Sequence, residues 1–168
     1  AKGFGVDVVS LHLRKLGIEN HMVEIGGEVR AAGNNNGRAW RIGIESPGKN
    51  YSLTQKVVNL KNMALATSGS YRNYFKSNGK KYSHAIDFKT GKPVKHTLAS
   101  VSVISAKGCM EADSWATALM VMGPVKGLKL AKELKMAAFF IYKKTTDDDK
   151  DFIETMTPEF KLHLGENI

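Results

Sequence analysis

Residues 109–123, CMEADSWATALMVMG, form the stretch around which we expect the rest of the chain to fold. Apolar side chains recur there at spacings of three and four, the period of an α-helix with one buried face. The members of that face are Met110, Ala112, Ala116, Leu119, Met120 and Met122. Gly123 and Pro124 follow, a pair typical of a helix end. The pattern therefore predicts an amphipathic helix that ends at Gly123.

Two polar residues interrupt this apolar pattern. Asp113 and Thr117 are four residues apart, so their side chains lie one above the other on the same helix face. A carboxylate and a hydroxyl supply half of a site for Mg2+, which prefers oxygen ligands and keeps water or phosphate oxygens in the rest of its shell. The alternative is structural, with Asp113 near the helix N-terminus and Thr117 bonded back to a carbonyl.

Composition limits the class of protein. A chain of 168 residues is one domain or part of a larger one, and its single cysteine, Cys109, rules out an internal disulfide framework. The net charge of +9 suggests an anionic partner such as nucleic acid, a membrane surface or phosphate. Because the basic residues are spread along the chain without interleaved aromatic residues, we expect a basic solvated surface and no nucleic-acid partner.

The first residues predict a helix that begins at about Gly5 and ends at Gly17. Its expected buried face consists of Val6, Val9, Leu13 and Leu16. Lys2 then lies in the turn that enters the helix, where its ammonium group and the helix amides can bind phosphate together. A solvated terminal lysine is the alternative.

The rest of the chain reads as strands followed by helices. Asn34–Gly37 is a hairpin turn that pairs residues 38–44 with the preceding strand, and Val57–Leu60 pairs with Met63–Thr67. The other expected elements are strands at 21–25, 28–32, 98–106, 137–142 and 152–156, a helix at 125–134 and a short helix from Pro158. This order predicts an α+β fold, a mixed, largely antiparallel sheet with helices packed on one face.

Two further stretches carry polar side chains suited to a site. Thr67–Tyr74, TSGSYRNY, holds small residues that let the backbone approach a phosphate or a ring, or that form a strand bulge. In SHAIDFKTGKP, residues 83–93, His84 lies beside a turn that begins at Asp87. A histidine there can act as a general base near neutral pH, or it can be a surface residue.

Seven motifs occur together and in order: AKGFGVD, VEIGGEVRAAG, RAWRIGIESP, TSGSYRNYF, SHAIDFKTGKPV, LASVSVISA and EADSWATALMVMG. This set strongly resembles the ApbE family, the FAD:protein FMN transferases, over nearly the whole chain. The resemblance implies an ApbE-like (T-fold-like) α+β fold. It also implies that residues 1–168 are the C-terminal portion of a single flavin transferase domain.

The resemblance implies a reaction as well. Family members use FAD and Mg2+, transfer FMN through a phosphoester to a Thr or Ser hydroxyl of an acceptor protein, and release AMP. Their acceptors resemble flavin-carrying subunits of Na+-translocating NADH:quinone reductase and of Rnf-type complexes. Members are usually exported to the bacterial periplasm, often as membrane-anchored lipoproteins, so we expect that location here.

The resemblance also implies roles for individual residues, because their positions match those of functional residues in the family. Asp113 and Thr117 match the family's Mg2+ ligands, although Ala116 replaces a further acidic residue of some members. Lys2 and Ile86 match positions that contact FAD. His84 matches the histidine that activates the acceptor hydroxyl, and Asp87 is a candidate to orient it.

Other interpretations remain open. A further Mg2+ ligand and much of the FAD pocket of the family would precede Ala1, so we expect these 168 residues alone to bind FAD weakly. Some family members hydrolyse FAD to FMN and AMP at the same metal site. A more distant alternative is a non-catalytic basic module that binds an anionic surface in a salt-dependent way.

Overall fold

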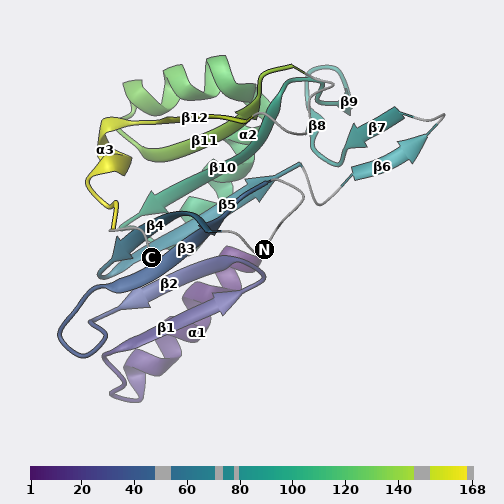
Figure 1. The fold of residues 1–168 in the computed structure, drawn as a ribbon. Helices are drawn as coiled ribbons and strands as arrows, with labels where there is room; N and C mark the ends of the chain where they lie inside the picture. The colour runs from purple at the N-terminus through teal and green to yellow at the C-terminus, as the bar shows by residue number, and fades with distance from the viewer. Residues whose placement is uncertain (48–53, 71–73, 78–79, 146–151, 166–168) are drawn as a thin grey trace.

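A six-stranded sheet forms the middle layer of the protein (Figure 1). The computed structural model describes residues 1–47, 54–70, 74–77, 80–145 and 152–165. From one edge to the other, the strands of this sheet are β1 (His21–Ile25), β2 (Glu28–Ala32), β5 (Met63–Gly69), β10 (Leu98–Ser105), β11 (Ala137–Lys143) and β12 (Phe152–Met156). All neighbours in it are antiparallel, which confirms the predicted α+β fold with a largely antiparallel sheet.

Strand β11 shows why both faces of the sheet are covered. Its run AAFFIY is apolar without alternation, and successive side chains of a strand point to opposite faces. Ala138 and Phe140 pack in the core beneath the helices, whereas Phe139 and Ile141 pack in a second core on the other face. A continuous apolar run therefore requires a layer on each side.

The second face is covered by a hairpin of β3 (Trp40–Glu45) and β4 (Thr54–Leu60). The predicted pairing of residues 38–44 with β2, and of β4 with β5, is therefore wrong. The turn itself is present, since Asn35 and Arg38 exchange backbone hydrogen bonds of 2.8 and 3.1 Å. The chain then leaves the sheet because Ile44, Val58 and Leu60 bury their side chains on its second face.

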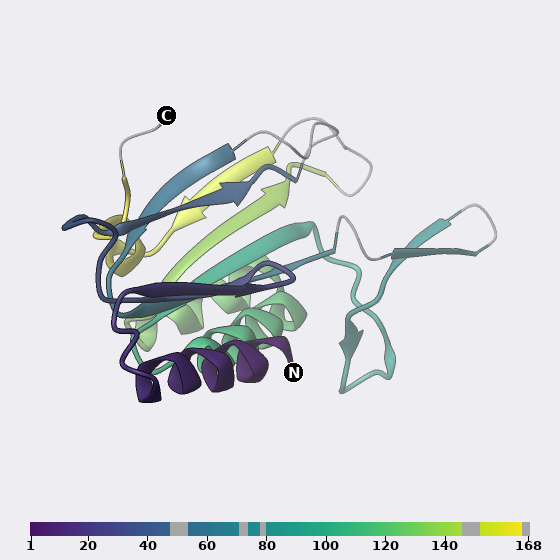
Figure 2. The same ribbon diagram turned by 90° about the horizontal axis from the view of Figure 1, so that it is seen from below.

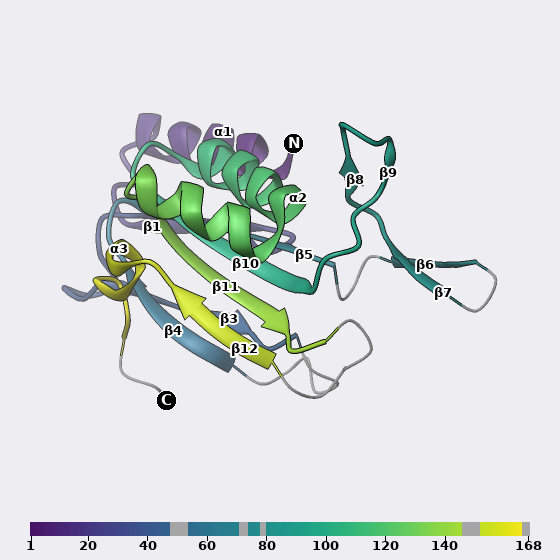
Figure 3. The same cartoon turned by 90° about the horizontal axis from the view of Figure 1, so that it is seen from above.

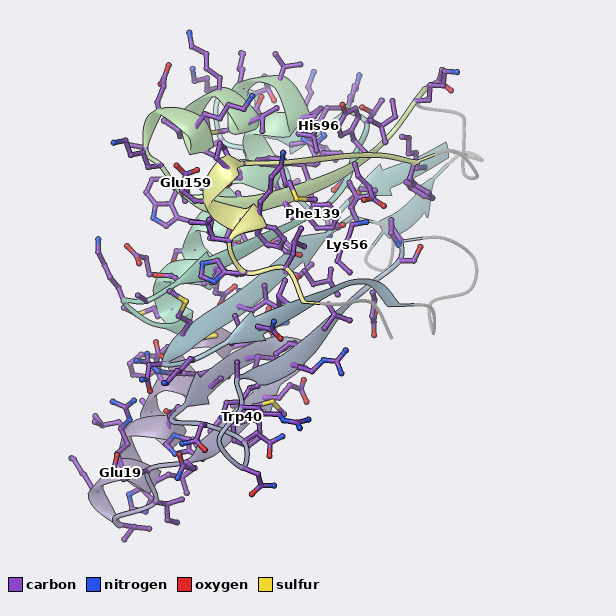
Figure 4. The ribbon with its side chains drawn as sticks, turned by 60° about the vertical axis from the view of Figure 1, so that its left-hand side comes forward. Glu19, Trp40, Lys56, His96, Phe139 and Glu159 are labelled. Carbon is purple, nitrogen blue, oxygen red and sulfur yellow. The ribbon has the colours of Figure 1, made fainter. Side chains whose placement is uncertain are left out.

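Helix α3 (Pro158–Lys161) lies on that second face too, so only α1 and α2 fulfil the prediction of helices on one face. Its Phe160 ring stacks on Phe139 with a centroid separation of 5.4 Å, and Figure 4 shows Phe139 beside this helix. In the part of the chain that the structure describes, no helix is long and apolar enough to cross a membrane.

Helix α1 (Lys2–Lys15) begins earlier than predicted. Val6 is buried, but Val9 and Leu16 are 42% and 63% exposed, so half of the expected buried face is wrong. The buried positions are instead Gly3, Val6 and Ser10. Gly3 on this face lets α1 lie close against α2, and Ser10 forms a hydrogen bond of 2.8 Å with His21 of β1.

Helix α2 (Cys109–Glu133) consists of two segments, as predicted. Gly123 has non-helical angles (φ 80°, ψ 176°), and the second segment folds back beside the first (Figure 3). A Cβ atom at Gly127 would lie 3.1 Å from the carbonyl oxygen of Leu119, which shows how closely the segments pack. Four predicted core residues of the first segment are buried, whereas Met110 and Met122 are 54% and 36% exposed.

Two small hairpins extend from one end of the sheet (Figure 2). They are β6 (Tyr74–Ser77) with β7 (Lys80–Ser83), and β8 (Ile86–Asp87) with β9 (Lys92–Pro93). The N-terminus lies at the same end of the molecule in Figures 2 and 3. The candidate residues from distant parts of the sequence are thus gathered at one end of the fold.

Candidate functional site

Asp113 lies where the first turn of α1 meets α2. The backbone N–H of Gly3 donates a hydrogen bond of 3.0 Å to Oδ2 of Asp113. The Asp113 side chain is only 19% exposed. This contact joins two stretches that the sequence analysis selected separately, the start of the chain and the first segment of α2.

Lys2 lies within the first turn of α1 and reaches across to the turn between β1 and β2. Its Nζ donates a hydrogen bond of 2.9 Å to the Gly26 carbonyl and forms an ion pair of 2.6 Å with Oε2 of Glu28. The Lys2 side chain is 53% exposed. Lys2 is therefore held in place while part of its side chain faces solvent, as a group that binds an anion requires.

Glu28 was not identified from the sequence. Its side chain is only 4% exposed, and burial raises the pKa of this carboxyl group while the Lys2 ammonium group lowers it. The charge of Asp113 raises the pKa of Glu28 further, so the two carboxylates influence each other. The signal in the sequence is a charged residue that begins a strand immediately after a Gly-Gly turn, where it faces the helix layer.

Thr117 follows Asp113 by one helical turn and faces β5. Its Oγ1 lies 3.3 Å from Oγ of Ser68, in the small-residue stretch selected from the sequence. Strand β5 pairs with β10 in unbroken register from residue 64 to 69, so the alternative of a bulge is wrong over this range, and residues 71–73 lie outside the described ones. One carboxylate and two hydroxyls thus lie along α2 and β5.

These oxygen donors fit a hard cation such as Mg2+. Asp113 and Thr117 would hold it, and water or phosphate would complete the shell, as Mg2+ commonly requires. Within the described ranges there is no group of three or more His, Cys, Asp and Glu side chains able to hold a metal. Asp113 and Thr117 alone therefore form an incomplete set of ligands.

Asp7 fixes the beginning of α2, a role that the sequence did not reveal. Its carboxylate accepts hydrogen bonds from the backbone N–H groups of Cys109 (2.9 Å) and Met110 (2.8 Å) and pairs with Arg30 at 2.6 Å. Burial raises the pKa of Asp7, but these hydrogen bonds and the Arg30 charge together hold it below the usual value. Since α2 has no side-chain cap of its own, α1 supplies one.

His84 and Ile86 lie on a different segment, between β7 and β9. Ala85 between them packs against the core beneath α2, whereas His84 is exposed and Ile86 is 47% exposed. Asp87 uses Oδ1 to accept a hydrogen bond of 2.9 Å from the Lys89 N–H, which confirms the predicted turn. The structure thus joins Lys2 to Asp113 through α1 and presents His84 and Ile86 from a neighbouring hairpin.

Cys109 has a structural environment. It is fully buried, and burial together with the charges of Asp7, Glu28 and Asp113 raises the pKa of its thiol to about 12. A thiol with so high a pKa is not a nucleophile near neutral pH. Cys109 is therefore a buried structural cysteine.

Comparisons with known proteins show which family the chain resembles. The chain is 46% identical over 166 residues to the FAD:protein FMN transferase of Vibrio cholerae, covering 98% of this chain and 48% of that protein. It is 44% identical over 163 residues to the enzyme of the same name from Haemophilus influenzae, covering 96% and 46%. The chain therefore spans about half the length of the curated relatives it matches.

Solved structures share the fold. The apo form of the Pseudomonas stutzeri flavinyl transferase ApbE superposes with a TM-score of 0.82 at 42% identity, covering all of this chain and 51% of that one. The ApbE protein of Thermotoga maritima gives a TM-score of 0.84 at 28% identity, covering 98% and 52%. Residues 1–140 match the model of the ApbE family, and the chain belongs to that family.

Proposed function

We propose that the protein containing this chain transfers FMN from FAD to a Thr or Ser hydroxyl of an acceptor protein, with Mg2+, and releases AMP. The observation that carries the proposal is the contact between Gly3 and Asp113. Gly3 follows Lys2, for which we propose phosphate binding, and it contacts Asp113, for which we propose metal binding. The chain is also 46% identical to a FAD:protein FMN transferase.

Different residues bind FAD and Mg2+. The exposed part of Lys2 binds an oxygen of the FAD pyrophosphate, next to the first turn of α1. Ile86 offers an apolar side chain to FAD. Asp113 and Thr117 hold Mg2+, which when bound neutralises charge on the pyrophosphate.

His84 acts on the acceptor. It accepts the proton of the hydroxyl group, whose oxygen forms a bond to the phosphorus of the FMN half. The bond between that phosphorus and the bridging oxygen breaks, and the bridging oxygen leaves with AMP. Proton transfer by a positioned histidine contributes roughly 100-fold or more to such a step.

The acceptor and the location follow from the same family. We propose flavin-carrying subunits of Na+-translocating NADH:quinone reductase or Rnf-type complexes as acceptors. We propose the bacterial periplasm as the location, with a lipoprotein anchor. Exposed His84 and Ile86 leave room for a protein acceptor at this end of the fold.

The test uses the natural protein that carries this chain, with FAD, Mg2+ and a candidate acceptor subunit. AMP is measured by chromatography and the acceptor by intact mass. We expect AMP and an FMN-sized mass gain, both lost in Asp113→Ala and without Mg2+. Glu133→Gln, which removes an exposed carboxylate from the second segment of α2, serves as control and should remain active.

The other outcomes identify the alternatives. AMP without a mass gain on the acceptor indicates FAD hydrolysis, with water in place of the hydroxyl. Neither product, together with salt-dependent binding to anionic surfaces that Asp113→Ala leaves unchanged, indicates a non-catalytic basic module. Either result contradicts the proposed transfer.

A further inference from the structure

The turn between β1 and β2 is shaped around the Lys2 side chain. Gly26 has φ +58°, and a Cβ atom there would lie 3.1 Å from Cδ of Lys2 and 3.5 Å from its Nζ. The lysine stem therefore crosses the turn at Gly26, where no side chain blocks it. Its ammonium group then meets the Gly26 carbonyl at 2.9 Å and Glu28 at 2.6 Å. An ammonium group has three N–H donors, so these two acceptors leave one for a ligand.

Burial of the ion pair is uneven. The Glu28 side chain is 4% exposed, whereas that of Lys2 is 53% exposed. The carboxylate thus lies beneath the ammonium group, fixed in the sheet, and the ammonium group faces outward. A long lysine side chain is otherwise free to adopt many rotamers, and such an anchor removes that freedom before a ligand arrives.

The same carboxylate affects the charge of the site. Asp113 raises the pKa of Glu28, so the two groups are electrostatically coupled. The negative charges of these two carboxylates oppose the approach of a pyrophosphate to Lys2, and a divalent cation bound at Asp113 would reduce that opposition.

We propose that Glu28 is a positioning residue that holds Lys2 against the β1–β2 turn and makes the binding of a pyrophosphate ligand depend on a divalent cation. This rests on the proposed function only for the identity of the ligand, FAD. The positioning of Lys2 is a property of the fold and can be tested without FAD.

The first measurement is the rate of reductive methylation of Lys2, followed by mass spectrometry of the natural protein. In Glu28→Gln the ammonium group loses its anchor and its neutralising partner, so we expect methylation of Lys2 to rise about fivefold. Glu19→Gln is the matched control, since Glu19 is exposed and lies at the far end of α1 (Figure 4). Methylation of Lys2 at an unchanged rate in Glu28→Gln overturns the proposal.

The second measurement is the dissociation constant of FAD with and without Mg2+. We expect Mg2+ to strengthen FAD binding in the unaltered protein, and this strengthening to fall about tenfold in Glu28→Gln. An equal dependence on Mg2+ in both proteins overturns the electrostatic part of the proposal. If the unaltered protein binds no FAD in either condition, the proposed function fails, while the methylation of Lys2 still decides the role of Glu28.

A further variant tests the proposal in case Glu28→Gln does not fold. Glu28→Asp keeps the charge and shortens the side chain, so it weakens the anchor without leaving a buried amide. If Glu28→Gln does not fold, as judged by circular dichroism, faster methylation of Lys2 in Glu28→Asp supports the proposal. An unchanged rate there contradicts it.

Discussion

The backbone N–H of Gly3 donates a hydrogen bond of 3.0 Å to Asp113, although 110 residues separate them in the chain. This contact fixes the first turn of α1 against α2 and sets Lys2 beside a carboxylate. It needs a glycine, because a Cβ atom at residue 3 would lie 2.8 Å from Cβ of Asp113. The candidate site therefore depends on how closely two helices approach.

Gly3→Ala should separate these helices. The added methyl group meets Asp113 and the backbone of Cys109, so we expect a loss of stability of roughly 1–3 kcal/mol, as in overpacked cores, and loss of FMN transfer. The measurements are urea unfolding and the transfer assay. Gly5→Ala is the matched control, since its Cβ atom would meet only Cδ1 of Ile25 at 3.5 Å. Equal stability of the two variants would contradict close helix packing as the cause.

Asp7→Asn should weaken the start of α2. The amide cannot accept from both backbone N–H groups and pair with Arg30 as the carboxylate does, so we expect a loss of roughly 1–3 kcal/mol at neutral pH. Urea unfolding at neutral pH measures this loss.

At acidic pH, the Asp7 carboxylate should no longer make the unaltered protein more stable than Asp7→Asn. The pKa of Asp7 in the folded protein is below the ordinary value of 3.8, so its contribution is present above 3.8 and is lost as the pH falls through the lower folded value. The stability difference between Asp7→Asn and the unaltered protein should therefore shrink in acid. A difference that is the same at neutral and acidic pH would refute the assigned role.

Cys109 should resist alkylation in the folded protein. Its thiol is buried, and burial with the neighbouring carboxylates raises its pKa to about 12, so almost no thiolate is present near neutral pH. Iodoacetamide followed by mass spectrometry should show no modification of the folded protein and full modification in denaturant. Rapid modification of the folded protein would show that α1 and α2 open readily around this residue.

Gly123→Ala should destabilise the reversal between the two segments of α2. Gly123 has φ +80°, and a Cβ atom there would lie 2.7 Å from Cδ2 of His96. Backbone strain and steric overlap together should cost roughly 2–4 kcal/mol, measured by urea unfolding. Gly37→Ala is the control, because its φ of +83° is similar and a Cβ atom would meet nothing within 4 Å. A loss in Gly37→Ala as large as that in Gly123→Ala would exclude the contact with His96 as a major cause.

His84→Gln should separate chemistry from binding. If His84 accepts the proton of the acceptor hydroxyl, transfer should slow by roughly 100-fold or more while the dissociation constant of FAD stays within about twofold. His12→Gln, an exposed histidine on α1, is the control. Both variants are assayed by acceptor mass and by FAD titration, and full transfer by His84→Gln would remove this residue from the mechanism.

The sequence predicted most helices and strands, but it predicted less well which of them pair or pack together. The Asn34–Gly37 turn and β3 were recognised, yet β3 pairs with β4 rather than with β2. A turn signal acts over a few residues, whereas the pairing of a strand depends on which apolar face it must cover. For the same reason Val9 and Leu16 of α1 are exposed, since packing against α2 selects Gly3 and packing against His21 of β1 selects Ser10 for the buried face.

The residues of the candidate site were likewise predicted only in part. Asp113 and Thr117 follow from a polar interruption of a helical pattern, because their spacing of four places them on one face in any α-helix. The sequence did not predict the roles of Glu28, Ser68 and Asp7, since each role depends on a partner far away in the chain. No local pattern distinguishes a buried glutamate that anchors a lysine from a solvated one.

By itself, then, the sequence determined the elements, the reversal at Gly123 and the ordered motifs of the ApbE family, because these depend on local periodicity, backbone angles and residue identity. Only the tertiary structure decided that Lys2 is anchored by Glu28 and that Gly3 meets Asp113. Such contacts form when helices and strands bury their apolar faces together, and the packing of those faces fixes which distant polar groups come within hydrogen-bonding distance.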